Sequence, residues 1–215
     1  MEYAADVVLA DEHTDDCVAA GGGCLDETGT PDLRWPGYLG ASYEPGGVLF
    51  VGNVHRNFDS AGVAVDVSWD LVAATLAFRV DPTATAPYLA AIRRSYLTGL
   101  AGSPCWTVAK TFQPVRAALG LEWTQLAYTN AGKTQMVVGS SHTPVIKGCL
   151  RRFPLPDLVK KLEASLVVTC SAEARKQLEV ARVPHVYFAQ AQQWRAVGQL
   201  EEAVARCAAW AEQRR

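Results

Sequence analysis

The chain has 215 residues, of which 49% are hydrophobic, 20% charged and 9% aromatic. This is the composition of a globular protein with a buried core, and it excludes a disordered, collagenous or coiled-coil chain. The net charge of −2 gives no overall positive field of the kind that marks many nucleic-acid-binding proteins, although a local basic rim remains compatible with transient contact with DNA.

The N-terminal 45 residues are irregular, because glycines and prolines interrupt any periodicity. We expect them to form an arm (1–45) ahead of one compact domain (46–215), in which short apolar runs alternate with segments of helical periodicity. The apolar runs predict strands at 48–51, 125–129, 165–170 and 185–188, and the helical patterns predict helices at 87–98, 156–164, 172–180 (with Ser171 as its cap) and 195–213.

Strands that alternate with helices in this way predict a parallel sheet with helices on both faces. The expected fold class is therefore α/β, a three-layer sandwich around a central four-stranded parallel sheet. Ligand sites of such sheets lie at the carboxyl ends of the strands. Four segments are expected to meet there: 52–59, 130–134, 170–171 and 189–194.

Nothing in the sequence predicts export or membrane insertion. No window approaches about 18 uninterrupted apolar residues. The chain starts without a basic segment and soon reaches Asp11 and Glu12, so we expect a cytoplasmic protein that does not contact a membrane. In that compartment the six scattered cysteines are expected to be reduced thiols or metal ligands. His13, Cys17 and Cys24 fit no standard zinc spacing, and we expect no metal site.

The sequence contains no phosphate-binding loop, dinucleotide-binding glycine motif, nucleophile elbow or zincin motif. The informative residues lie at the strand ends. They are Val51-Gly52-Asn53, Thr129-Asn130 with Lys133 three residues later, Cys149, and Thr169-Cys170-Ser171. In the order and spacing of these motifs, the chain from about residue 45 to 190 resembles the uracil-DNA glycosylase superfamily.

That resemblance implies a uracil-DNA glycosylase-like fold and a monofunctional DNA glycosylase. Such an enzyme flips a base out of DNA and hydrolyses its N-glycosidic bond without a cofactor. Gly52 corresponds to the glycine that lets the backbone approach the flipped base, and Asn53 to the polar residue beside it. Asn130 corresponds to the asparagine that reads the base edge, since an amide offers both a donor and an acceptor. A helix cap is the alternative role for Asn130.

Other residues that would contact DNA follow the strands. Phe58 is a candidate platform on which the base would stack, with a buried core position as its alternative. Arg56 and Lys133 are candidates to hold the DNA phosphates, and ordinary surface positions are the alternative for both.

A glycosylase must stabilise the departing base and act on an oxocarbenium-like sugar. His55, Asn53 and Gln190 are the candidate hydrogen-bond donors to the base. Asp59 is the candidate carboxylate that orients water, preferred to Asp66 because it lies nearer to the first strand. A solvated loop acid is the alternative for both aspartates.

The chain departs from the family pattern at its catalytic positions. Val54 stands where the family usually has Asp or Asn, and His55 where it usually has Pro. The later His-Pro-Ser loop is missing, and Thr134 replaces a cysteine of the iron–sulfur branch, so no cluster is expected.

These departures favour a substrate other than plain uracil, such as a modified cytosine of phage DNA, in single- or double-stranded DNA. Two alternatives remain: a catalytically inactive glycosylase-fold module that binds DNA, and an unrelated α/β enzyme for a small molecule. Nothing in the sequence demands more than a monomer.

Overall fold

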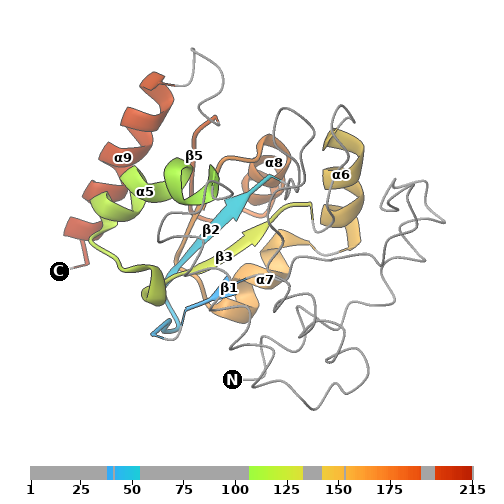
Figure 1. Cartoon of the computed structure of the whole chain (residues 1–215). Coiled ribbons are helices and arrows are strands. Elements are labelled where there is room, and N and C mark those ends of the chain that lie inside the picture. The colour runs from blue at the N-terminus through green and yellow to red at the C-terminus, as the bar shows by residue number, and fades with distance from the viewer. Residues whose placement is uncertain are drawn as a thin grey trace, which may run out of the picture.

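The computed structural model describes residues 38–40, 42–53, 107–132, 142–152, 154–189 and 197–214. Within these ranges the secondary structure follows in chain order (Figure 1). The elements are β1 (Tyr38–Leu39), β2 (Val48–Gly52), α5 (Thr107–Leu119), the 3₁₀ helix η2 (Trp123–Gln125), β3 (Ala127–Asn130), α6 (His142–Arg152), α7 (Leu155–Leu162), β4 (Leu166–Thr169), α8 (Ala172–Val180), β5 (His185–Tyr187) and α9 (Val197–Glu212). The helix expected at 87–98 lies outside the described residues.

The strands form one sheet in the order β1-β3-β2-β4-β5. β2 pairs in parallel with both β3 and β4, and β4 pairs in parallel with β5. The four-stranded parallel sheet expected from the sequence is therefore confirmed. The structure adds β1, a short antiparallel strand on β3, within the segment that the sequence analysis treats as an irregular arm.

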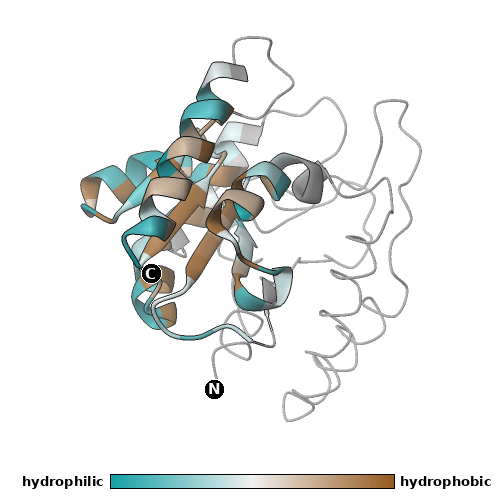
Figure 2. Ribbon diagram, turned by 90° about the vertical axis from the view of Figure 1, so that its left-hand side faces the viewer, coloured by the Kyte–Doolittle hydropathy of each residue, from teal (hydrophilic) through white to brown (hydrophobic). Residues whose placement is uncertain are grey.

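Helices cover both faces of this sheet, so the described part of the chain has three layers. Phe50 and Tyr128 belong to a core that includes residues of α5 and α9, which we call the α5–α9 core. Leu49 and Val167 belong to a second core, which includes residues of α6, α7 and α8. Because both faces are covered, β2, β3 and β4 are buried along their whole length, and their residues are mostly hydrophobic, with the polar Thr129, Asn130 and Thr169 toward their carboxyl ends. Figure 2 shows this as brown strands between helices of mixed hydropathy.

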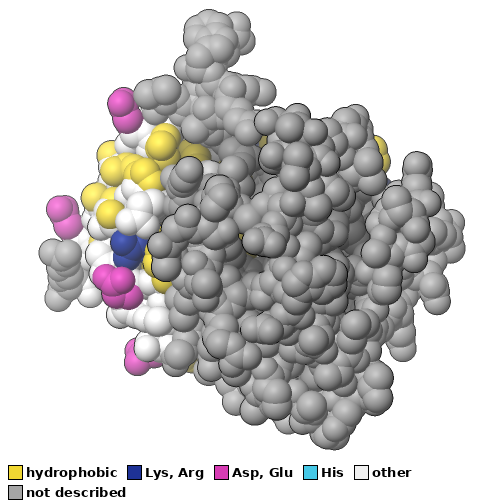
Figure 3. Space-filling model, in the orientation of Figure 1, with side chains coloured by type: hydrophobic (Ala, Val, Ile, Leu, Met, Phe, Trp, Pro, Cys, Tyr) yellow, Lys and Arg dark blue, Asp and Glu magenta, His cyan; other side chains and the backbone are white. Residues whose placement is uncertain are grey.

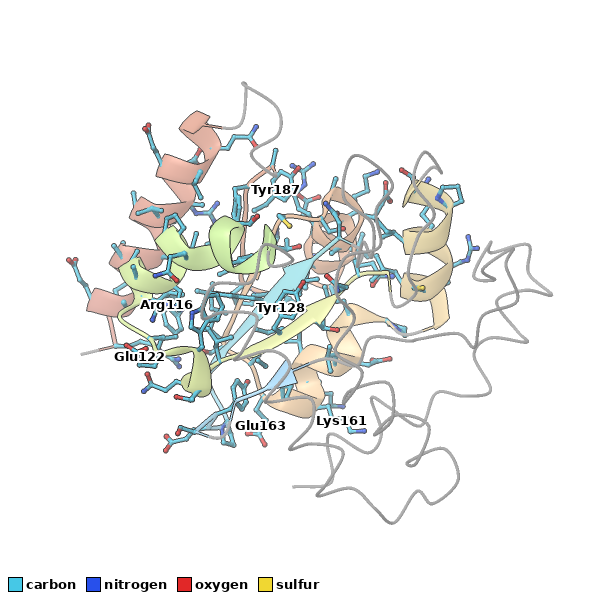
Figure 4. All side chains as sticks on the ribbon, in the orientation of Figure 1. Arg116, Glu122, Tyr128, Lys161, Glu163 and Tyr187 are labelled. Carbon is cyan, nitrogen blue, oxygen red and sulfur yellow. The ribbon has the colours of Figure 1, made fainter. Side chains whose placement is uncertain are left out.

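An aromatic cluster organises the α5–α9 core. The Phe112 ring of α5 stacks on Phe50 with 4.9 Å between ring centroids. It also meets Phe188 edge-on at 5.4 Å and Tyr128 at 6.2 Å. Such ring pairs contribute roughly 0.5–1.5 kcal/mol each beyond the burial of their area. Tyr128, labelled in Figure 4, is therefore held in place by its neighbours from α5.

Most element boundaries lie within two residues of the predicted ones. Helix α8 spans 172–180 as predicted, and its cap is confirmed, because the Ser171 hydroxyl accepts a hydrogen bond of 3.3 Å from the Ala174 N–H. Helix α7 ends at Leu162, two residues earlier than predicted, because Glu163 adopts a left-handed φ of 50° and caps the helix. Strand β3 starts at Ala127, two residues later than predicted, because residues 123–125 form the 3₁₀ helix η2.

Four elements of the described residues have no counterpart in the sequence analysis: β1, α5, the 3₁₀ helix η2 and α6. Helix α5 contains Pro114, whose ring removes one backbone donor and disfavours a helix interior. None of the helices described in the structure has the length and apolar character needed to cross a lipid bilayer.

Candidate functional site

The carboxyl ends of β2, β3 and β4 meet at one edge of the sheet (Figure 1). From β2 the chain passes to β3 on one side of it, whereas from β4 it passes to β5 on the other side. The adjacent ends of β2 and β4 are therefore a topological switch point, and open α/β sheets bind their ligands in the crevice at such a point. We call this edge the switch-point site.

Gly52 is packed directly against two side chains of β3. In the sheet register Gly52 lies beside Asn130. The Tyr128 hydroxyl donates a hydrogen bond of 2.5 Å to Oδ1 of Asn130. A Cβ atom at position 52 would lie 2.5 Å from both of those oxygens, closer than any real Cβ contact. Any residue larger than glycine would therefore displace the Tyr128–Asn130 pair.

Asn130 presents a donor at this edge. Its side chain is buried, with 4% of the residue exposed, and its Oδ1 accepts the Tyr128 hydrogen bond. No hydrogen bond joins its Nδ2 to any described residue. Asn130 is the last residue of β3. Asn130 is thus a buried residue at the carboxyl end of β3; the chain from 133 to 141 lies outside the described residues, so both sequence-based roles of Asn130 stay predictions.

A buried threonine joins the ends of β2 and β4. The Thr169 hydroxyl donates to the carbonyl oxygen of Val51 at 3.0 Å and accepts from the Ser171 N–H at 3.0 Å. Nδ2 of Asn53 lies 3.5 Å from the carbonyl oxygen of Cys170, at the outer limit of a hydrogen bond. These contacts fix the spacing of the two strand ends at which the switch point forms.

The described part of the site carries no charged side chain: residues 52–53, 130–132 and 170–171 are all uncharged at neutral pH. Burial raises the pKa of the Cys170 thiol to about 12, although the backbone N–H groups of Asn53 and Cys170 lower it. Cys170 is thus a neutral thiol and a poor nucleophile. These residues can donate and accept hydrogen bonds, but they supply no general base.

Metal binding finds no support within the described ranges. No group of three metal-ligating side chains occurs among the residues that the structure describes. Cys149, Cys170 and Cys207 are free and buried, as expected for reduced thiols. Cys17 and Cys24 lie outside the described residues.

The structure brings together three of the predicted site residues: Gly52 and Asn130 lie side by side, and Asn53 follows Gly52 at the end of β2. The remaining candidates lie outside the described residues: His55, Arg56, Phe58, Asp59, Asp66, Lys133 and Gln190, together with Val54 and Thr134.

Sequence reasoning missed Tyr128 and Thr169. Tyr128 stands two residues before Asn130 in a strand, and side chains two residues apart share one face of a sheet. This two-residue spacing could have predicted the contact between the Tyr128 and Asn130 side chains. Thr169 carried no comparable signal, since threonine is common in strands.

Within the ranges that the structure describes, the chain is an open α/β sheet whose strand ends at the switch point carry polar, uncharged side chains. No protein-family model matches the chain, and the comparison with curated proteins finds no relative.

Proposed function

We propose that this chain is a monofunctional DNA glycosylase of the uracil-DNA glycosylase fold, which binds an extruded base at the switch-point site. The observation that carries the proposal is the arrangement of Gly52, Tyr128 and Asn130. A glycine with no room for a side chain lies beside a buried asparagine whose amide nitrogen has no partner among the described residues. This is the geometry expected of a position that lets a planar ligand approach the backbone and donates a hydrogen bond to its edge.

The direction of the Tyr128–Asn130 hydrogen bond limits which base edges Asn130 can bind. Because Tyr128 donates to Oδ1, the Asn130 amide is oriented with Nδ2 available as the donor. A pyrimidine edge that carries carbonyl oxygens or an unprotonated ring nitrogen supplies the matching acceptor. Burial excludes competing water, so the contact discriminates strongly between bases with and without that acceptor.

The chemistry is assigned to the loops beyond the described strand ends. Water adds to C1′ of the sugar while the bond to the base nitrogen breaks, and the base leaves as an anion that takes up a proton. Asp59 is proposed to orient the water and to stabilise the positive charge on the sugar. His55, Asn53 and Gln190 are proposed to donate hydrogen bonds to the departing base.

Three further candidates from the sequence complete the proposed DNA contact: Phe58 as the stacking platform, and Arg56 and Lys133 at the phosphates. On the face drawn in Figure 3, the described surface shows hydrophobic and acidic side chains with only a small basic patch. The proposed phosphate contacts are therefore assigned to these loop residues and not to that described surface. The preferred substrate is a modified cytosine rather than plain uracil, because Val54 and His55 replace the usual family residues.

The test is a panel of labelled oligonucleotides and phage DNAs, from plain uracil to glucosylated hydroxymethylcytosine, incubated with the protein and then treated with alkali. A strand break that requires alkali on one substrate supports the proposal and names the base. Absence of alkali-labile sites on every substrate, with the protein folded, would contradict it.

Two variants test the assigned roles on the cleaved substrate. Asn130→Ala removes the donor, and we expect loss of base discrimination worth about 1–3 kcal/mol. Asp59→Asn is expected to lower turnover while leaving DNA affinity unchanged. Full activity of the Asn130→Ala variant would contradict the base-binding role of Asn130 on which the proposal rests.

A second candidate function is a glycosylase-fold module that binds DNA without cleaving it. It is favoured by one observation, namely that the described residues of the switch-point site carry no ionisable group able to act as a base at neutral pH. Tight DNA binding in a mobility-shift assay, with no abasic product and no effect of Asp59→Asn, would select this function.

A further inference from the structure

A groove of about 440 Å³ lies on the helical layer formed by α6, α7 and α8. The groove shares no residue with the switch-point site, since none of its lining residues belongs to a strand end. Its walls are partly apolar, with Leu150, Pro154, Pro156 and Val180 among the lining residues. Val180 is 86% exposed, the largest exposure of a large hydrophobic residue in the described part of the chain.

The groove also carries positive charge that the described residues do not neutralise. Lys147 and Arg151 of α6 and Lys176 of α8 line it, together with one acid, Glu173. Glu173 is already paired with Lys176, at 2.8 Å. Lys147 and Arg151 are exposed and form no ion pair with a described residue. The groove thus combines apolar walls with two uncompensated cations.

The sequence contains a segment of complementary character. Residues 1–37 hold nine Asp and Glu and a single Arg, a net charge of −8, which leaves +6 for residues 38–215. The same segment contains the apolar run Val7-Val8-Leu9 shortly before the acidic pair Asp11-Glu12. An apolar run next to an acidic pair matches both properties of the groove.

The path of the chain allows this segment to reach the groove. β1 runs antiparallel to β3, so its first residue, Tyr38, lies toward the edge at which the parallel strands end. An extended chain of 37 residues spans up to about 120 Å, so length does not limit its reach. A tethered segment also has an effective concentration in the millimolar range, which compensates for weak individual ion pairs.

We propose that the α6–α8 groove is the docking site of the acidic segment 1–37 of the same chain, with acidic side chains at Lys147 and Arg151 and an apolar run on the Leu150–Val180 wall. DNA phosphates are a weaker match, because they would leave the apolar wall without a partner. This proposal does not depend on the glycosylase activity.

The test is zero-length carbodiimide cross-linking of the full chain at low concentration, followed by mass spectrometry. Carbodiimide joins carboxylates to lysine amines that lie in direct contact. We expect cross-links from acids of residues 1–37 to Lys147 in at least tenfold higher yield than to Lys160, an exposed lysine of α7. Figure 4 labels its neighbour Lys161 near the end of α7, at the lower edge of the fold, whereas α6 and α8 lie in the upper half.

A charge variant sharpens the test without removing the reactive amine. Arg151→Glu should lower the Lys147 cross-link several-fold, and 0.5 M salt should lower it too, because the Debye length then falls to a few ångströms. The matched variant Lys160→Glu should leave the Lys147 yield unchanged.

Three outcomes would overturn the proposal. One is an equal yield at Lys147 and Lys160. Another is cross-links found only between two chains in a mixture of isotopically light and heavy protein. The third is an Arg151→Glu variant that keeps the cross-links but loses affinity for a DNA duplex, which would assign the groove to nucleic acid.

Discussion

Tyr128 and Asn130 are joined side chain to side chain across one pleat of β3, with 2.5 Å between the Tyr128 hydroxyl and Oδ1 of Asn130. Both side chains point to the same face because they are two residues apart in a strand. The tyrosine ring is held by Phe112, and the asparagine lies beside Gly52 at the switch point. The aromatic core thereby sets the orientation of the amide at the strand end.

Tyr128→Phe tests that relationship. The variant keeps the ring contacts but leaves Oδ1 of Asn130 without its donor in a buried position, so the free energy of unfolding should fall by about 1–3 kcal/mol. Urea denaturation measures this change. The control is Tyr187→Phe on β5, because the half-buried Tyr187 ring lies under Arg175, 4.6 Å from centroid to guanidinium carbon, and that contact needs no hydroxyl. Equal stability losses in both variants would contradict a special role for the Tyr128 hydroxyl.

Gly52→Ala should disrupt the Tyr128–Asn130 hydrogen bond from the neighbouring strand, β2. The new Cβ would lie 2.5 Å from both oxygens, so the side chains or strands must shift, and we expect a loss of about 1–3 kcal/mol together with weakened ligand binding. Gly198→Ala in α9 is the matched control, because a Cβ there meets no atom within 4 Å. Alanine favours a helix, so the control should unfold with an unchanged or slightly higher free energy, by up to about 1 kcal/mol.

Thr169→Val should weaken the junction between the ends of β2 and β4. The substitution keeps the shape but leaves the Ser171 N–H without its acceptor, at a cost of about 1–3 kcal/mol, whereas the Val51 carbonyl loses one of two donors and still accepts from the Cys170 N–H at 3.1 Å. Thr169→Ser keeps the hydroxyl and removes only a buried methyl group, so it should cost about 1 kcal/mol. Denaturant unfolding compares the two, and a serine variant less stable than the valine variant would refute the hydrogen-bond argument.

Alkaline pH should destabilise the fold. Burial raises the pKa of Cys170 from 9.0 to about 12, and that of Cys207 likewise, with Arg206 lowering the latter. Below pH 9 these thiols are protonated in both the folded and the unfolded chain. As the pH rises from 9 to 12 the unfolded thiols ionise first, the unfolded state binds fewer protons, and the free energy of unfolding falls.

Tyr43 adds to this dependence at higher pH. Burial, with a smaller contribution from the Glu163 charge, raises its pKa from 10.0 to about 12. The Tyr43→Phe variant should therefore show a shallower decline above pH 10 than the unmodified chain does. Urea titrations at intervals from pH 7 to 11 measure both slopes, and a free energy of unfolding that stays constant over this range would show that these groups are not buried.

The sequence by itself determined the four parallel strands and the helices α7, α8 and α9. Their signals are local: continuous apolar runs such as Val48 to Val51, a proline near the first turn of α7, and Ser171 as a helix cap. Alternation of strands with helices then implied a parallel sheet and placed Gly52, Asn53 and Asn130 at its carboxyl edge. These predictions succeeded because each depends on residues close together in the chain.

Only the tertiary structure decided which strands are neighbours and which atoms meet. The order β1-β3-β2-β4-β5 brings Thr169 to Val51 across 118 positions of sequence, and no local pattern encodes that pairing. Helix α5, with Pro114 in its interior, is stabilised by burial of Phe112 and Val115 against the sheet, which outweighs the local cost of the proline. The requirement for glycine at position 52 likewise arises from side chains of another strand, because the space available to a Cβ depends on packing between strands.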